Sequence, residues 1–233
     1  MRTTPGSLPW LIVHDARLGA RRLDDILPNI SPVRRRLVIA VAVLVLHALA
    51  WPVARWIKAA ETDPAASGML LGGLAAVLAF AASWMLAQSL LAVTRVLYVR
   101  GDLDLMLSAP LAAGKVVAAR GLGLAAENFA SSGIFLLPVA HALALQGHLH
   151  WLALYPTLLA MALAAAAFGL GAALGLFRLI GARRARAVSQ VVAMLIGATV
   201  ALGIQALAVL PRDLSALALA EAARAFLREP GGF

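Results

Sequence analysis

The sequence predicts an all-α protein, a polytopic bundle of transmembrane helices, and two observations support this fold class: the composition and the long apolar runs. Of the 233 residues, 62% are hydrophobic and 13% are charged, whereas a soluble domain is ~45–50% apolar and ~25% charged. The apolar residues are gathered in long runs, and a run of about 20 can cross a bilayer as a helix that satisfies its own backbone. The chain has no cysteine, which excludes disulfides and cysteine nucleophiles.

Five apolar runs are long enough to span a membrane. Together they contain one carboxylate, Glu127, and no Lys or Arg. Their expected bounds are 37–54, 68–93, 121–145, 151–177 and 187–210. The chain therefore divides into a segment 1–36, a transmembrane domain 37–210 with a loop 94–120 after its second span, and a tail 211–233.

The basic residues are distributed unequally between the two sides of the predicted membrane. Fifteen Lys and Arg residues fall in segment 1–36 and in the loops after spans two and four, against five on the other side. The positive-inside rule then places the N-terminus in the cytoplasm and the tail outside. The net charge of +9 is thus explained by topology. We expect a multi-pass protein of the cell (inner) membrane that contacts the lipid bilayer and no nucleic acid.

Residues 8–27 form the main pattern of the N-terminal segment. Apolar or small residues recur at helical spacing, and charged residues lie mainly away from this stripe. Such a two-sided pattern predicts an amphipathic helix in the plane of the inner interface. A simple topogenic anchor is the alternative.

The loop after the second span contains a short helical pattern. Asp102 follows Gly101 and is a good N-cap residue. Apolar side chains share one face at spacings of three and four, and a proline ends the segment. Its characteristic residues are Asp102, Leu103, Asp104, Met106, Leu107 and Pro110. This apolar face packs either against the membrane helices or against a partner protein.

Polar residues in the third span predict a functional or packing stripe. Ser131 and His141 lie within about 40° of Glu127 on a helix of 3.6 residues per turn, and Asn128 flanks them. A charge inside a membrane is costly unless it is paired, protonated or hydrated, so we expect the stripe to face the bundle. It serves either interhelical hydrogen bonding or a substrate or proton pathway.

No enzyme motif is present. The sequence has no G-x-S-x-G or H-E-x-x-H pattern, and the segment around Gly114-Lys115 lacks the first glycine and the hydroxyl residue of a phosphate-binding loop. We therefore expect no catalytic residue, metal or cofactor. His47 and His141 lie in different spans, where a hydrogen bond to a neighbour is favoured over haem ligation. His148 and His150 are expected to be solvated.

Two segments carry a resemblance to a known family. They are Leu97-Tyr98 with Asp102–Pro110 and the apolar-basic run to Arg120, and the basic loop 178–186 that leads into span five. Together with the weaker segment Trp10–Arg17, they resemble the membrane subunits of ATP-binding-cassette (ABC) exporters of the type-2 permease class. In such permeases the loop after the second span holds the coupling helix that fits the ATPase. The resemblance therefore implies that residues 102–110 contact an ABC ATPase.

The resemblance implies a permease subunit of an ATP-driven transporter, an exporter rather than an importer, which works by alternating access. ATP hydrolysis would then occur on a separate ATPase subunit. This chain would be the N-terminal half of such a permease or a short form, pairing with a second half or a second copy. Two other readings stay open: a membrane scaffold or assembly protein that transports nothing, and a proton-coupled secondary carrier that uses Glu127.

Overall fold

The structure, a computed structural model, describes residues 7, 10, 31–99, 113–180 and 182–209. Within these ranges it is built from helices and contains no strand. The elements are α2 (Pro32–Thr62), α3 (Pro64–Val99), α5 (Ala113–Leu145), the 3₁₀ helix η1 (Leu149–Ala153), α6 (Leu154–Ile180) and α7 (Ala182–Val209). The predicted all-α fold is confirmed. The expected in-plane helix, the coupling segment 102–110 and the tail lie outside the described residues.

Four helical segments among the described residues are long and apolar enough to cross a membrane. They are Pro32–Thr62, Ala66–Ala92, Gly114–Leu145 and Leu149–Ile180. The chain therefore has the character of a multi-pass membrane protein. The fifth predicted span falls in α7, whose apolar stretch within the described residues is Gln190–Thr199. This span stays a prediction.

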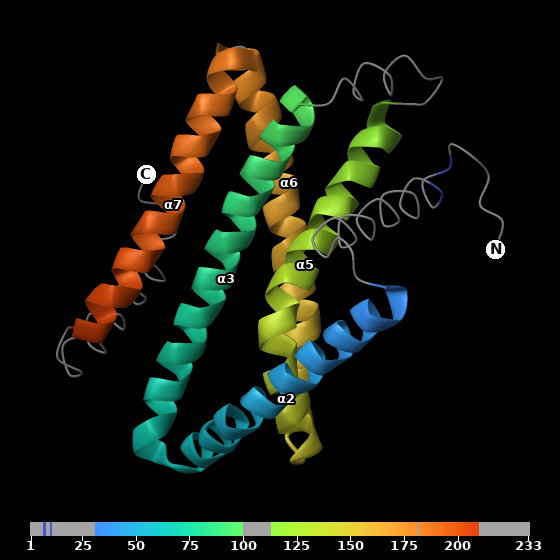
Figure 1. Cartoon of the computed structure of the whole chain (residues 1–233). Coiled ribbons are helices and arrows are strands. Elements are labelled where there is room, and N and C mark those ends of the chain that lie inside the picture. Colours follow the sequence, from blue (N-terminus) through green and yellow to red (C-terminus); the bar gives the residue numbers. More distant parts are fainter. Residues whose placement is uncertain (1–6, 8–9, 11–30, 100–112, 181, 210–233) are drawn as a thin grey trace.

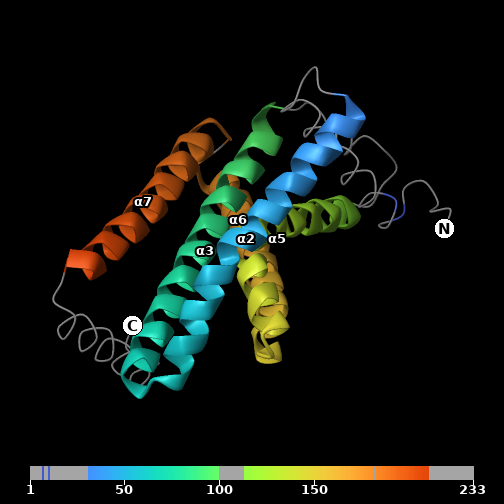
Figure 2. The ribbon, with the colours of Figure 1, turned by 60° about the horizontal axis from the view of Figure 1, so that its bottom comes forward.

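The long helices meet at two ends of the molecule (Figure 1). The carboxyl end of α3, the amino end of α5 and the corner between α6 and α7 lie toward the same end of the molecule, which we call the loop end. The turn between α2 and α3 and the connection from α5 through η1 to α6 lie at the opposite end, which we call the turn end. Helix α2 runs obliquely across the others, and α7 packs against α3 at the edge (Figure 2).

Local sequence explains where these helices begin and end. Ser31 caps α2 because its hydroxyl accepts from the backbone N–H of Arg34 at 3.4 Å, and Pro32 occupies the first helical position. Asp63 alone separates α2 from α3, and its carbonyl accepts from the backbone of Ser67 at 2.9 Å. The chain therefore reverses at the turn end within a single residue.

The carboxyl end of α5 is closed by a Schellman motif. The backbone N–H of His148 donates to the carbonyl of Leu143 at 3.0 Å, and that of Gly147 donates to Ala144 at 3.0 Å. Gly147 has a φ of 95°, a conformation that glycine adopts without a Cβ penalty. This glycine lets the chain leave α5 abruptly and directs the next residues, His148 onward, along the turn end.

Two buried clusters hold the bundle together. At the turn end, Ala54 and Ile57 of α2 pack on Ala142 and Leu143 of α5. Deeper in the bundle, the second cluster joins α3 to α6, with partly buried side chains from α5 beside it, and its buried members are Met85, Leu158, Ala162 and Ala165. Small residues are frequent in both clusters, as expected where helices associate in lipid by close packing.

Candidate functional site between α2, α5 and α6

A chain of hydrogen bonds joins three helices near the turn end. His47 of α2 lies with its Nε2 3.0 Å from Nδ1 of His141 of α5, and His141 Nε2 contacts the hydroxyl of Tyr155 at the start of α6. The other ring nitrogen of His47, Nδ1, lies 2.8 Å from the carbonyl oxygen of Val43. The two imidazole rings are stacked, with centroids 5.3 Å apart. All three polar side chains are half-buried.

The geometry assigns one direction to the protons of this chain. The Val43 carbonyl can only accept, so His47 Nδ1 carries the hydrogen and its Nε2 accepts from His141 Nδ1. His141 Nε2 is then left to accept from the Tyr155 hydroxyl. Every group is satisfied with both histidines neutral, and bonds aligned in one direction strengthen one another.

The same geometry decides between the two expectations for the histidines. Two nitrogens on opposite faces of one haem iron would lie about 4 Å apart, because metal–nitrogen bonds are about 2.0–2.1 Å. At 3.0 Å, His47 and His141 are in direct hydrogen-bond contact, which leaves no space for an iron between them. The expectation that each histidine bonds to a neighbour is confirmed.

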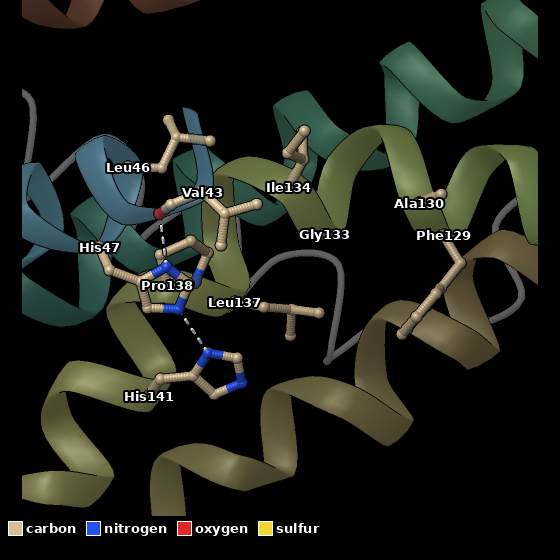
Figure 3. A pocket seen from close by; sticks show the side chains of 10 residues that line it. All are labelled: Val43, Leu46, His47, Phe129, Ala130, Gly133, Ile134, Leu137, Pro138 and His141. Carbon is tan, nitrogen blue, oxygen red and sulfur yellow. Dashed lines mark hydrogen bonds between the residues drawn. The ribbon is translucent and has the colours of Figure 1, made fainter. Parts of the chain in front are cut away.

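A pocket of about 200 Å³ opens beside the histidines, between α2 and α5. The two imidazoles stand at one end and Phe129 at the other (Figure 3). Apart from the histidines the lining is apolar, and it consists of Val43, Leu46, Phe129, Ala130, Gly133, Ile134, Leu137 and Pro138. The shape and the apolar lining suit an apolar chain.

A second polar contact lies deeper in the bundle, where α3, α5 and α6 meet. The side-chain amide of Asn128 donates to the Ser89 hydroxyl at 2.8 Å, and both residues are buried. Gly169 of α6 faces Ser89: a Cβ on this glycine would lie 2.6 Å from the Ser89 Cβ. The absence of a side chain at 169 therefore brings α6 against α3.

The polar residues predicted along the third span do not form one site. Asn128 is buried against Ser89, and Ser131 donates to the carbonyl of Asn128 within its own helix at 3.0 Å. His141 joins the histidine chain, about 20 Å further along α5 for a rise of 1.5 Å per residue. Glu127 is exposed, so the expectation that it faces the bundle is wrong. A rotation of one residue on the helix brings Asn128 inward in its place.

The structure corrects the expectation for one of the two histidines in the short loop after α5. His148 is half-buried and its Nδ1 lies 2.8 Å from Oε2 of Glu61, so it is paired with a carboxylate. His150 is 66% exposed, as expected, although its Nε2 lies 3.2 Å from Oε1 of the same carboxylate. Glu61 lies in the last turn of α2 and is far away in sequence.

Sequence reasoning missed Tyr155, Gly169 and Glu61. Tyr155 is a hydroxyl at the edge of an apolar run, which is a weak signal of a buried hydrogen bond. Gly169 is one glycine among 19 in the chain, and the G-x-x-x-G pairs noted by spacing are not the packing sites. At Gly68, Gly72, Gly171 and Gly175 a Cβ would meet nothing within 4 Å.

Comparison of the chain with protein-family models, with curated proteins and with solved structures finds no match. The functional argument therefore rests on the residues of this chain.

Proposed function

We propose that this chain is the transmembrane permease subunit of an ATP-driven ABC exporter. The observation that carries the proposal is the sequence of the segment Asp102–Pro110, which resembles a coupling helix. Its pattern predicts an acidic N-cap and an apolar face of Leu103, Met106 and Leu107. A separate ATPase subunit binds this segment and drives the bundle between inward-open and outward-open states through its different affinities for them.

The arrangement of the helices supports this proposal. The segment joins α3 to α5, and the ends of both helices lie at the loop end beside the corner between α6 and α7 (Figure 1). That end also carries Lys115, Arg120 and Arg178, the basic side that the positive-inside rule places in the cytoplasm. On this proposal, an ATPase bound at the loop end contacts the ends of α3 and α5 directly. It acts on α6 through the corner between α6 and α7.

The pocket between α2 and α5 supports a role in moving molecules with an apolar chain. Its lining is apolar almost throughout, because the ring nitrogens of the two histidines are engaged in their own hydrogen bonds. On this proposal, the substrate pathway across the membrane is completed by a second copy of the chain or by a second permease half.

The experiment is a mild-detergent pull-down of the tagged chain from its native membrane. We expect a co-purifying subunit with a phosphate-binding loop, which is lost in Met106→Asp. The matched control is Leu149→Asp, which places the same charge on an exposed leucine at the turn end and should retain the ATPase. Recovery of the inserted chain without an ATPase, or equal retention in both variants, would contradict the proposal.

One observation favours a second candidate, a proton-coupled carrier. The chain from His47 through His141 to Tyr155 holds two titratable rings within helices able to span a membrane. Such groups are typical of proton relays. On this reading His141→Gln abolishes transport in proteoliposomes with no ATPase present. Glu127→Gln, expected from sequence to be decisive, then has the smaller effect.

A further inference from the structure

We infer that Glu61, His148 and His150 form a Zn²⁺ site at the turn end of the molecule. Each residue offers one ligand atom, and the three atoms lie within 4.8 Å of one another. The inference does not depend on the proposed transport function, because it concerns the turn end, opposite the end at which α3 stops and α5 begins (Figure 1).

The distances agree with those around one zinc ion. Two atoms bound at about 2.1 Å in tetrahedral geometry lie about 3.4 Å apart. Glu61 Oε2 lies 2.8 Å from His148 Nδ1, and Glu61 Oε1 lies 3.2 Å from His150 Nε2. Both distances are slightly shorter than about 3.4 Å, so a zinc ion enters when these side chains spread slightly.

The backbone and a neighbouring side chain hold two of the three ligands in position. The Schellman motif with Gly147 fixes the backbone of His148, and the indole N–H of Trp151 donates to Glu61 Oε1 at 2.7 Å. A hydrogen bond to a ligating carboxylate orients it for the metal. Trp151 in turn packs against the turn-end core cluster, so the site is supported by the core itself.

The types of ligand atom indicate which metal binds, and the exposure of the side chains indicates how the metal reaches the site. Two imidazoles and one carboxylate suit Zn²⁺, whereas Ca²⁺ and Mg²⁺ prefer oxygen ligands throughout. The His148 and Glu61 side chains are 23% and 22% exposed, while His150 is 66% exposed. Three protein ligands leave a fourth position open to water or to a ligand from outside. The bound ion ties the end of α2 to the connection between α5 and α6.

The test uses the full chain, purified in mild detergent with a tag that contains no histidine and then stripped with a chelator. Titration calorimetry with Zn²⁺ should show one ion per chain and a higher melting temperature once the ion is bound. Glu61→Gln and His148→Ala should abolish this binding. Asp63→Asn is the matched control, since it removes a carboxylate two residues away that is outside the group, and it should bind Zn²⁺ like the parent chain.

Two further variants keep the test decisive if Glu61→Gln fails to fold. His150→Ala removes an exposed ligand and should weaken binding about tenfold or more without changing the helical circular dichroism. Trp151→Phe removes the hydrogen bond to Glu61 and should weaken binding about tenfold. Co²⁺ should give the intense visible absorption of a tetrahedral site in the parent chain and in Asp63→Asn, and not in Glu61→Gln or His148→Ala. A chain that binds no Zn²⁺, or equal binding in every variant, would overturn the inference.

Discussion

The two polar contacts inside the bundle differ in what surrounds them. Ser89 and Asn128 are 0% and 4% exposed, and Gly169 brings a third helix directly against Ser89. The chain from His47 through His141 to Tyr155 is half-buried and borders a pocket. Both contacts satisfy polar groups between helices, yet only the second lies at the edge of a cavity. We therefore assign a packing role to the Asn128 contact.

The largest expected effect is at Gly169. Gly169→Val places atoms within 2.6 Å of the Ser89 Cβ and 3.1 Å of its backbone carbon. Because backbone must move to relieve this contact, we expect a loss of about 1–3 kcal/mol in the free energy of unfolding. Gly171→Val on the same helix is the control, since a Cβ there meets nothing within 4 Å. Denaturation in detergent micelles measures both, and equal losses would refute a close approach at 169.

A smaller effect is expected at Asn128. Asn128→Leu removes the amide that donates to Ser89 and leaves a buried hydroxyl without that partner. Interhelical hydrogen bonds in membrane proteins contribute about 0.6 kcal/mol on average and up to about 1.7, and burial places this one near the upper value. The same unfolding assay should show almost no change for Ser131→Ala, whose hydroxyl bonds within its own helix. A larger loss for Ser131→Ala would reverse the assignment.

The smallest effect on stability is expected in the histidine chain. Tyr155→Phe keeps the ring and removes the hydroxyl that bonds to His141, at a cost of about 0.6 kcal/mol. Tyr155→Phe and His47→Gln should not be additive, because both act through the proton positions of His141. The comparison pair is Tyr155→Phe with Asn128→Leu, about 20 Å away along α5, whose losses should add.

A double-mutant cycle measures the coupling free energy between the two substitutions of each pair. Coupling of about 0.5 kcal/mol or more in the first pair, and none in the second, is expected if the histidine chain acts as a unit. Equal additivity in both pairs would mean that His47 and Tyr155 contribute independently.

Much of the fold could be predicted because long apolar runs in a sequence indicate membrane-spanning helices. The spans 37–54, 68–93, 121–145 and 151–177 all fall within helices of the structure. The helices are longer than these spans, since Ser31 caps α2 before the apolar run begins and Thr62 ends it well beyond. Capping and chain reversal decide such bounds, and hydropathy does not report them.

The candidate site was only partly predictable. His141 and Asn128 were singled out correctly as polar groups in an apolar span, but Glu127 was assigned the inward position that Asn128 holds. Hydropathy is nearly uniform around these helices, so no amphipathic pattern fixes their rotation. An error of one residue turns a helix by about 100°, which exchanges a buried side chain for an exposed one.

The sequence by itself determined that this chain is an α-helical membrane protein and where its apolar helices run, because a backbone in lipid must satisfy its own hydrogen bonds. Only the tertiary structure decided which polar residues meet. His47 contacts His141, which lies 94 residues later in the chain, and Glu61 accepts a hydrogen bond from Trp151, which lies 90 residues later. Such contacts depend on the angles at which helices cross and on the rotation of each helix about its axis. Where helix surfaces are uniformly apolar, a few small or polar residues such as Gly169 and Asn128 set these angles and rotations.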